Sequence, residues 1–390
     1  MKQQDYYVYI SGWTNFGGTG GLHGYRMNGE SGELEYGQTY CEETSFNMSI
    51  VDRERNLLYA LNETPDLPEA ELVGGGGSLY IFKINPSDGT LTKVQQIPSY
   101  GANPCYVSID PQKKFLVIAH HASHAYTTHV KRGADGKYHI FVEHDDVTLC
   151  LFPMNGDGTV GDPVDVVKHT GWLPSKKIPN AGMHTACFSP SGEIVAVVDI
   201  AESRIHMYKI DYEHGKLYPC AAPYAEEHDL LPRYCLFHPS LPYFFVNHEM
   251  GSLDIFTYRY TEKGELEFVS STSSVPADHQ WKYHDEQQDM RMHPNGKYIY
   301  DAVNGPEYIS VLQIDEETGK LELIQNKKLK GEWARSCAVS PDGRFLIATC
   351  LISGDIDVFR IGEDGTLEDT GIHTRQSAAA WSTFYPIEKQ

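Results

Sequence analysis

A charged pair brackets one short stretch of the chain. Arg233 lies at the start of an apolar segment, a turn runs from Pro239 to Pro242, and Glu249 follows a second apolar segment. Antiparallel neighbours run in opposite directions, so the two side chains should emerge at the same edge of a sheet. A guanidinium beside a carboxylate at such an edge can bind an anionic oxygen and support proton transfer.

The same hairpin recurs along the chain, and this recurrence gives every strand end a comparable position. The turn proline, replaced by Arg53 in the first copy, serves as the reference point. Six residues before it lie Asn47, Cys105, His184, Arg233, Gln288, Arg335 and Ala380. Ten residues after it lie Gly12, Glu63, His121, Ile200, Glu249, Asn304 and Leu351, with Asp199 one residue before its slot.

Many of these end positions carry polar side chains that could act together. If the repeats form a ring, both sets surround one mouth of its central channel. Convergent polar groups at a concave mouth are typical of a ligand site. We therefore predict a pocket built around His184, Arg233 and Glu249. Predicted substrate contacts are Arg335, Glu63, His121, Asn304, Gln288 and Asp199, although Asp199 also suits an anchor between blades.

A second pattern identifies the elements that carry these residues. An alternating apolar strand is followed by a polar turn that ends in Gly-x-Leu or a close variant, with glycines at 32, 89, 158, 215, 264, 319 and 365. Their spacings of 57, 69, 57, 49, 55 and 46 residues match four-stranded blades with variable loops. The sequence therefore predicts an all-β, seven-bladed propeller.

The two ends of the chain complete the predicted ring. Residues 381–386 have the pattern of a first strand without a second, and residues 6–10 that of a second strand without a first. Joining them closes the ring and hides edge strands. We expect one domain over residues 1–390, with an insertion at about 120–146 and a possible lid loop at about 276–289.

The amino-acid composition argues against some classes of binding partner. Aromatic residues make up 12% of the chain, which favours strands, and the formal charge of −21 argues against a nucleic acid partner. No apolar run is long enough to cross a bilayer, and the amino terminus lacks the apolar core of a signal peptide. The eight cysteines form no CxxC pair. We expect a cytoplasmic protein, either a monomer or a homodimer, that does not bind membranes.

The ordered motifs resemble those of the seven-bladed lactonase propellers, a family that includes propeller-type 6-phosphogluconolactonase and 3-carboxy-cis,cis-muconate lactonising enzyme. The resemblance covers nearly the whole chain. It is carried by residues 103–107, 183–190 with 198–200, 232–233 with 237–239 and 247–249, and 334–335 with 340–343. Two positions depart from the family pattern: Gly182 replaces a His, and Gly305 replaces an Arg.

The resemblance implies a lactone hydrolase of the 6-phosphogluconolactonase type, acting in carbohydrate metabolism on a sugar-acid or related carboxylated lactone. It also implies that His184, Arg233 and Glu249 are catalytic. His184 or Glu249 would be the general acid/base, and Arg233, helped by Arg335, would bind anionic oxygen. The two departures leave open whether the substrate is phosphorylated.

Three alternatives remain open at this stage. The reverse reaction would make the protein a lactone-forming cycloisomerase. The same mouth could bind a protein or sugar without catalysis, because a fold does not determine a function. A cofactor is not required, but the closely spaced histidines His120, His121 and His124 could bind a divalent metal.

Overall fold

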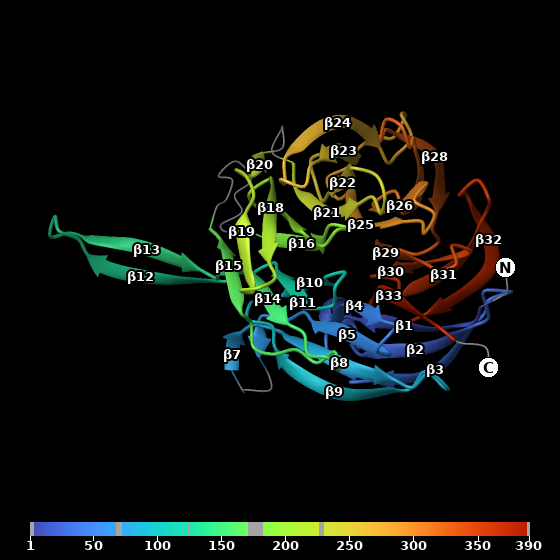
Figure 1. The fold of residues 1–390 in the computed structure, drawn as a ribbon, viewed down its shortest axis with the longest axis horizontal. Coiled ribbons are helices and arrows are strands. Elements are labelled where there is room, and N and C mark those ends of the chain that lie inside the picture. Colours follow the sequence, from blue (N-terminus) through green and yellow to red (C-terminus); the bar gives the residue numbers. More distant parts are fainter. Residues whose placement is uncertain (1–3, 68–71, 124, 171–181, 226–229, 388–390) are drawn as a thin grey trace.

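The computed structural model describes residues 4–67, 72–123, 125–170, 182–225 and 230–387. Within these residues the chain forms seven antiparallel sheets arranged in a ring (Figure 1). The prediction of a seven-bladed, all-β propeller is therefore confirmed. No helix of the described residues has the length and apolar character needed to span a membrane.

Each blade has four main strands, which are given below in order from the inner strand to the outer one. Blade 1 contains β33 (Ala379–Pro386), β1 (Tyr6–Gly12), β2 (Leu22–Met27) and β3 (Leu34–Tyr40). Blade 2 contains β4 (Phe46–Asp52), β5 (Leu57–Asn62), β8 (Ser78–Ile84) and β9 (Leu91–Pro98). Blade 3 contains β10 (Pro104–Ile109), β11 (Phe115–His120), β14 (Val147–Pro153) and β15 (Asp165–His169).

The remaining blades follow in chain order. Blade 4 contains β16 (Met183–Phe188), β17 (Ile194–Asp199), β18 (Arg204–Asp211) and β19 (Lys216–Pro219), with β20 (Tyr224–Ala225) also paired to β18. Blade 5 contains β21 (Pro232–Phe237), β22 (Tyr243–His248), β23 (Asp254–Tyr260) and β24 (Leu266–Ser273). Blade 6 contains β25 (Glu286–Met292), β26 (Tyr298–Asn304), β27 (Tyr308–Ile314) and β28 (Leu321–Lys328). Blade 7 contains β29 (Ala334–Val339), β30 (Phe345–Cys350), β31 (Asp355–Ile361) and β32 (Leu367–Arg375).

Burial follows position within a blade. The second strands β5, β11, β17 and β22 are buried along their whole length, because both of their faces pack against neighbouring blades. The outer strands β9 and β32 are buried only at their first residue, and their other residues are half-buried or exposed. The apolar core is therefore distributed between blades.

The termini close the ring as the sequence predicts. β33 pairs with β1 over their full length, and the backbone N–H of Ile387 donates to the Asp5 carbonyl at 2.9 Å. The amino- and carboxyl-terminal ends therefore share blade 1 (Figure 1).

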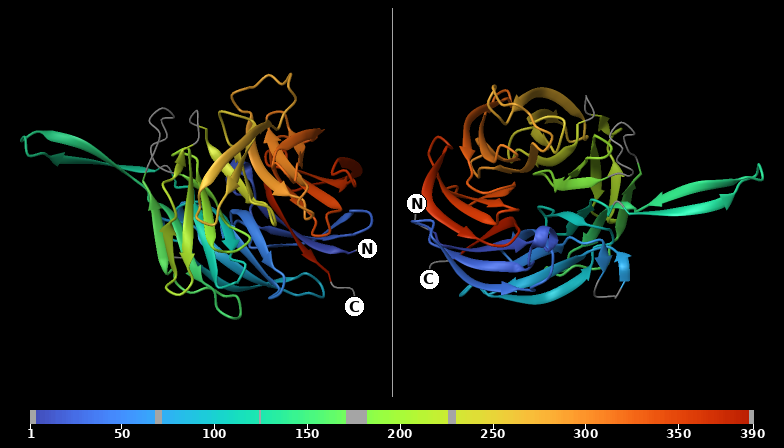
Figure 2. Two further views of the ribbon diagram at one scale, coloured as in Figure 1. Left: turned by 45° about the horizontal axis from the view of Figure 1, so that its top comes forward. Right: turned by 180° about the vertical axis from the view of Figure 1, so that it is seen from behind.

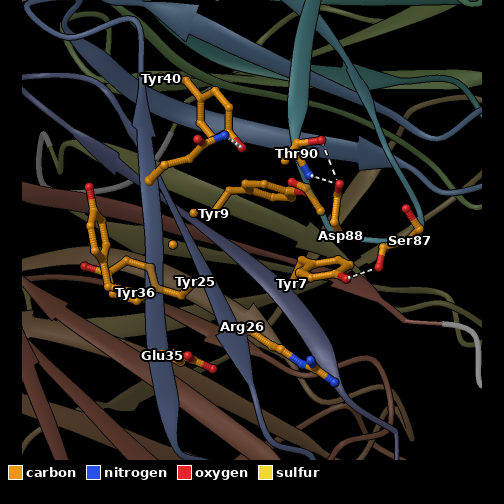
Figure 3. A pocket seen from close by; sticks show the side chains of 14 residues that line it. Tyr7, Tyr9, Tyr25, Arg26, Glu35, Tyr36, Tyr40, Ser87, Asp88 and Thr90 are labelled. Atoms are coloured by element: carbon orange, nitrogen blue, oxygen red, sulfur yellow. Dashed lines mark hydrogen bonds between the residues drawn. The ribbon is translucent and has the colours of Figure 1, made fainter.

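The blade 1 to blade 2 contact illustrates how neighbouring blades are joined. Tyr7 and Tyr9 of β1 approach the turn between β8 and β9, where their hydroxyls donate to the Ser87 and Gly89 carbonyls at 2.9 and 2.8 Å (Figure 3). A cavity of about 420 Å³ lies beside this contact.

The insertion forms a separate two-stranded ribbon, residues 126–144, which we call the arm. β12 (Tyr126–Arg132) and β13 (Tyr138–His144) pair with each other and project away from the ring (Figures 1 and 2). The other short elements are the 3₁₀ turn η1 (Asn15–Gly17) and the paired β6 (Asp66–Leu67) and β7 (Leu72–Gly75).

Candidate functional site

A β-bulge recurs at the start of every inner strand. In each case the register between the first and second strands skips a residue. The skipped residues are Asn47, Cys105, His184, Gln288, Arg335 and Ala380, and in blade 5 the pair Arg233 and Tyr234. These include all seven residues of the set six positions before the turn. Bulges release a side chain from the pleat and can re-aim it toward a site.

One pocket of about 250 Å³ gathers residues from both predicted sets. Seven of its side chains belong to the candidate site: Glu63, His121, His184, Arg233, Glu249, Gln288 and Arg335. Leu351, from the second set, also lines it. The propeller thus brings together residues from six blades that are far apart in the sequence.

The two arginines of the pocket are engaged differently. Arg233 Nη1 donates to Glu249 Oε2 at 2.8 Å, so the pair from which the pocket was predicted forms an ion pair. Arg335 Nη1 donates to Gln288 Oε1 at 2.8 Å, and its guanidinium lies 4.7 Å from the centre of the Trp13 ring. Both guanidiniums are therefore oriented before any ligand binds, which lowers the cost of binding an anionic oxygen.

His184 is buried among aromatic and cationic neighbours. Its ring lies edge-on to His121 and to Tyr234, with ring centres 5.9 and 5.0 Å away. Burial, reinforced by the positive charge of Arg233, holds the pKa of His184 well below its usual range. The imidazole is therefore neutral at physiological pH and can accept a proton.

Glu63 has a carboxyl group adapted to proton transfer. Burial raises its pKa to about 7, against the opposing influence of Arg335 and Asn47. Within the described part of the chain, its Oε2 atom is buried and accepts no hydrogen bond. A carboxyl that is partly protonated near neutral pH can act as a general acid or base.

Several pocket residues were not predicted. Trp13 and Phe16 come from the loop that includes η1, Trp333 precedes β29, and Glu286 opens β25. The rings of Trp13, Phe16 and Trp333 form an aromatic wall on one part of the pocket. Trp13 lies one residue after the predicted end position Gly12, and Trp333 lies two residues before Arg335. Aromatic residues next to the predicted end positions were therefore the sequence signal that could have identified them.

Other predicted residues lie elsewhere. Asn304 Nδ2 donates to the His284 carbonyl at 3.1 Å, and Asn304 does not line the pocket. Asp199 bonds to His169 of blade 3 at 2.7 Å, which is the blade-to-blade contact considered above. His120 Nδ1 lies 2.9 Å from the Thr148 carbonyl, whereas His121 faces the pocket. His124 lies outside the described residues.

The proposed lid loop contributes only at its end. The last residues of the predicted loop, 286–289, form the start of β25, where Gln288 Nε2 donates to Glu286 Oε2 at 2.7 Å. The exposed Trp281 and Tyr283 do not line the pocket.

Fold and site together define a propeller with a small polar pocket at the mouth of its channel, where buried acid/base groups stand beside two guanidiniums. The chain matches the model of the seven-bladed β-propeller lactonases over residues 7–384. It therefore belongs to this lactonase family.

Individual relatives are distant but nearly full length. A 6-phosphogluconolactonase of Bacillus subtilis (strain 168) is 25% identical over 369 residues, covering 93% of each chain. Among solved structures, a periplasmic gluconolactonase of Pseudomonas aeruginosa superposes with a TM-score of 0.82 at 17% identity, covering 98% of this chain and 100% of the other. A putative 6-phosphogluconolactonase of Bacteroides uniformis gives a TM-score of 0.81 at 20% identity, covering 98% and 100%. These structural likenesses support the fold.

Proposed function

We propose that the protein hydrolyses a sugar lactone in the pocket at the channel mouth. The observation that carries the proposal is the convergence of neutral His184, the Glu63 carboxyl and the Arg233–Glu249 ion pair in one pocket. Family membership and the names of the relatives support the same chemistry.

Each group has a defined task in the proposed reaction. The neutral imidazole of His184 takes a proton from water as the water oxygen attacks the lactone carbonyl carbon. Arg233 stabilises the negative charge that develops on the carbonyl oxygen, and Glu249 holds that guanidinium in place. As the bond from carbon to ring oxygen breaks, protonated Glu63 gives its proton to the leaving oxygen. The new carboxylic acid and the protonated His184 each lose a proton to solvent, and Glu63 regains one, so the products are a carboxylate and a hydroxyl group with one proton released.

The charge of the pocket favours an unphosphorylated lactone. Three carboxyl groups, Glu63, Glu249 and Glu286, face two guanidiniums, and no lysine of the described residues lines the pocket. Because Arg233 is paired with Glu249, a phosphate dianion would have to be held by Arg335, which bonds to the neutral Gln288. Trp13, Phe16 and Trp333 instead offer aromatic faces that suit the apolar face of a sugar ring.

The test is a proton-release assay with gluconolactone and its 6-phosphate. We expect His184→Ala and Arg233→Gln to lower kcat/KM by about 10²–10³-fold while the circular dichroism spectrum is retained. His293→Asn is the control, because His293 bonds to the Gly343 carbonyl in a hairpin turn outside the pocket. Unchanged turnover in the pocket variants would refute the assignment, and a preference for the phosphorylated lactone would refute the substrate class.

A further inference from the structure

A second cluster of metal-binding side chains lies outside the pocket, between blades 3 and 4. His169 ends β15, Glu202 follows β17, and His206 lies on β18. One ligand atom from each residue lies within 4.8 Å of the other two. His169 and Glu202 are buried, and His206 is half-buried.

Neighbouring groups orient His169 as they would a metal ligand. Its Nδ1 lies 2.7 Å from Asp199 Oδ2, and its Nε2 lies 2.8 Å from the Tyr208 hydroxyl. The other oxygen of Asp199 accepts backbone N–H groups, including that of Gly182 at 2.9 Å. An ionised Asp199 makes Nδ1 the protonated nitrogen, so the lone pair is on Nε2. A carboxylate that orients a histidine in this way is a common feature of metal sites.

The second histidine already shares a proton with the third candidate ligand. His206 Nε2 lies 2.9 Å from Glu202 Oε2, and the His206 ring stacks on that of His169 with centres 3.9 Å apart. A divalent cation would take the place of the proton between His206 and Glu202, and the two stacked rings would turn so that both nitrogens face it. With Nδ1 protonated, His169 Nε2 accepts the Tyr208 hydroxyl proton, and a bound ion would displace this hydrogen bond.

We propose that His169, Glu202 and His206 bind one divalent transition metal ion of the zinc type. Two imidazole nitrogens and one carboxylate oxygen are a ligand set typical of Zn²⁺. The ion would join β15 of blade 3 to blade 4. Because Asp199 contacts both His169 and the backbone of Gly182, it would also steady the start of β16, the strand that carries His184.

The test measures binding on the full chain after removal of metals with a chelator. We expect calorimetric titration with Zn²⁺ to give one equivalent per chain and Tm to rise with Zn²⁺ concentration. Co²⁺ should give the visible absorption of a four-coordinate site. Absence of stoichiometric binding would overturn the proposal.

Variants locate the ion independently of lactone turnover. His206→Gln and Glu202→Gln should each abolish the stoichiometric step and the Tm rise. His129→Gln and His139→Gln on the ribbon, together with His121→Gln in the pocket, should leave both unchanged. Binding that persists in the first group, or is lost in the second, would place the metal elsewhere.

Discussion

At the scale of residues, the pocket shows how burial tunes two proton-transfer groups in opposite directions. Burial disfavours charge, so it raises the pKa of the Glu63 carboxyl and lowers that of the His184 imidazole. Both groups are consequently uncharged over part of the neutral range. That pairing suits a reaction in which one group accepts a proton while the other donates one.

The first prediction concerns the pH dependence of catalysis. If protonated Glu63 is the general acid, kcat/KM should fall as pH rises above about 7, the folded-state pKa of its carboxyl. Glu63→Gln should lower kcat/KM and remove this limb of the profile. Steady-state rates between pH 5 and 9 measure both effects, and a profile unaltered in shape would exclude Glu63 as the acid.

The second prediction concerns the pH dependence of stability. The pKa of His184 is lower in the folded protein than in the unfolded chain, so the unfolded chain binds more protons as pH falls. The contribution of His184 to the free energy of unfolding should therefore decline below about pH 6.5, by at most about 1.4 kcal/mol per pH unit.

Urea denaturation of wild type and His184→Gln at pH 5, 6 and 7.5 measures this contribution. The unfolding free energy of the wild type should fall relative to that of the variant as pH falls. A difference that is constant across these values would show that His184 is not buried in its neutral form.

At the scale of elements, the hairpin turns owe their glycines to the neighbouring blade. Gly365 has a φ of +81°, and a Cβ on it would lie 2.5 Å from the ring of Tyr298. The Tyr300 hydroxyl donates to its carbonyl at 3.0 Å. The glycine thus meets two requirements, a left-handed backbone and a close aromatic contact.

The third prediction separates these two requirements. Gly365→Ala should lower the free energy of unfolding by about 2–4 kcal/mol, from backbone strain plus displacement of Tyr298. Gly371→Ala is the matched control, because Gly371 has a φ of +79° but a Cβ there would meet no atom within 4 Å. It should cost only about 1–2 kcal/mol. Equal losses would show that the aromatic contact contributes nothing.

At the scale of the whole molecule, stability depends on the closed ring. β33 supplies the inner strand of blade 1 and also contacts blade 2, where Trp381 Nε1 donates to the Ser49 carbonyl at 2.9 Å. Removing β33 would expose the edge of β1 and one side of the neighbouring blades.

The fourth prediction follows from this closure. A chain that ends at residue 378 should lose its cooperative thermal transition. A circular permutant should keep that transition if its original ends are linked and its new ends lie at the arm tip, near residue 134, because the arm stands outside the ring (Figure 2). Differential scanning calorimetry compares the two, and a cooperative transition in the truncated chain would contradict the prediction.

The sequence by itself determined the number of blades, the closure by both termini and most of the pocket. These features follow from local patterns repeated around the ring, so equivalent positions in each repeat, such as those of His184, Arg233 and Arg335, converge at one mouth. Local patterning dictates strand and turn positions before any long-range contact is known.

Only the tertiary structure decided which end positions face the pocket and how they are tuned. Asp199 and Asn304 occupy end positions but bond to neighbouring segments, whereas Trp13 and Phe16 reach the pocket from a loop. The insertion forms an arm that leaves the ring, and no repeat predicts its direction. The pKa values of Glu63 and His184 depend on burial by distant segments, a property that arises only when the ring closes.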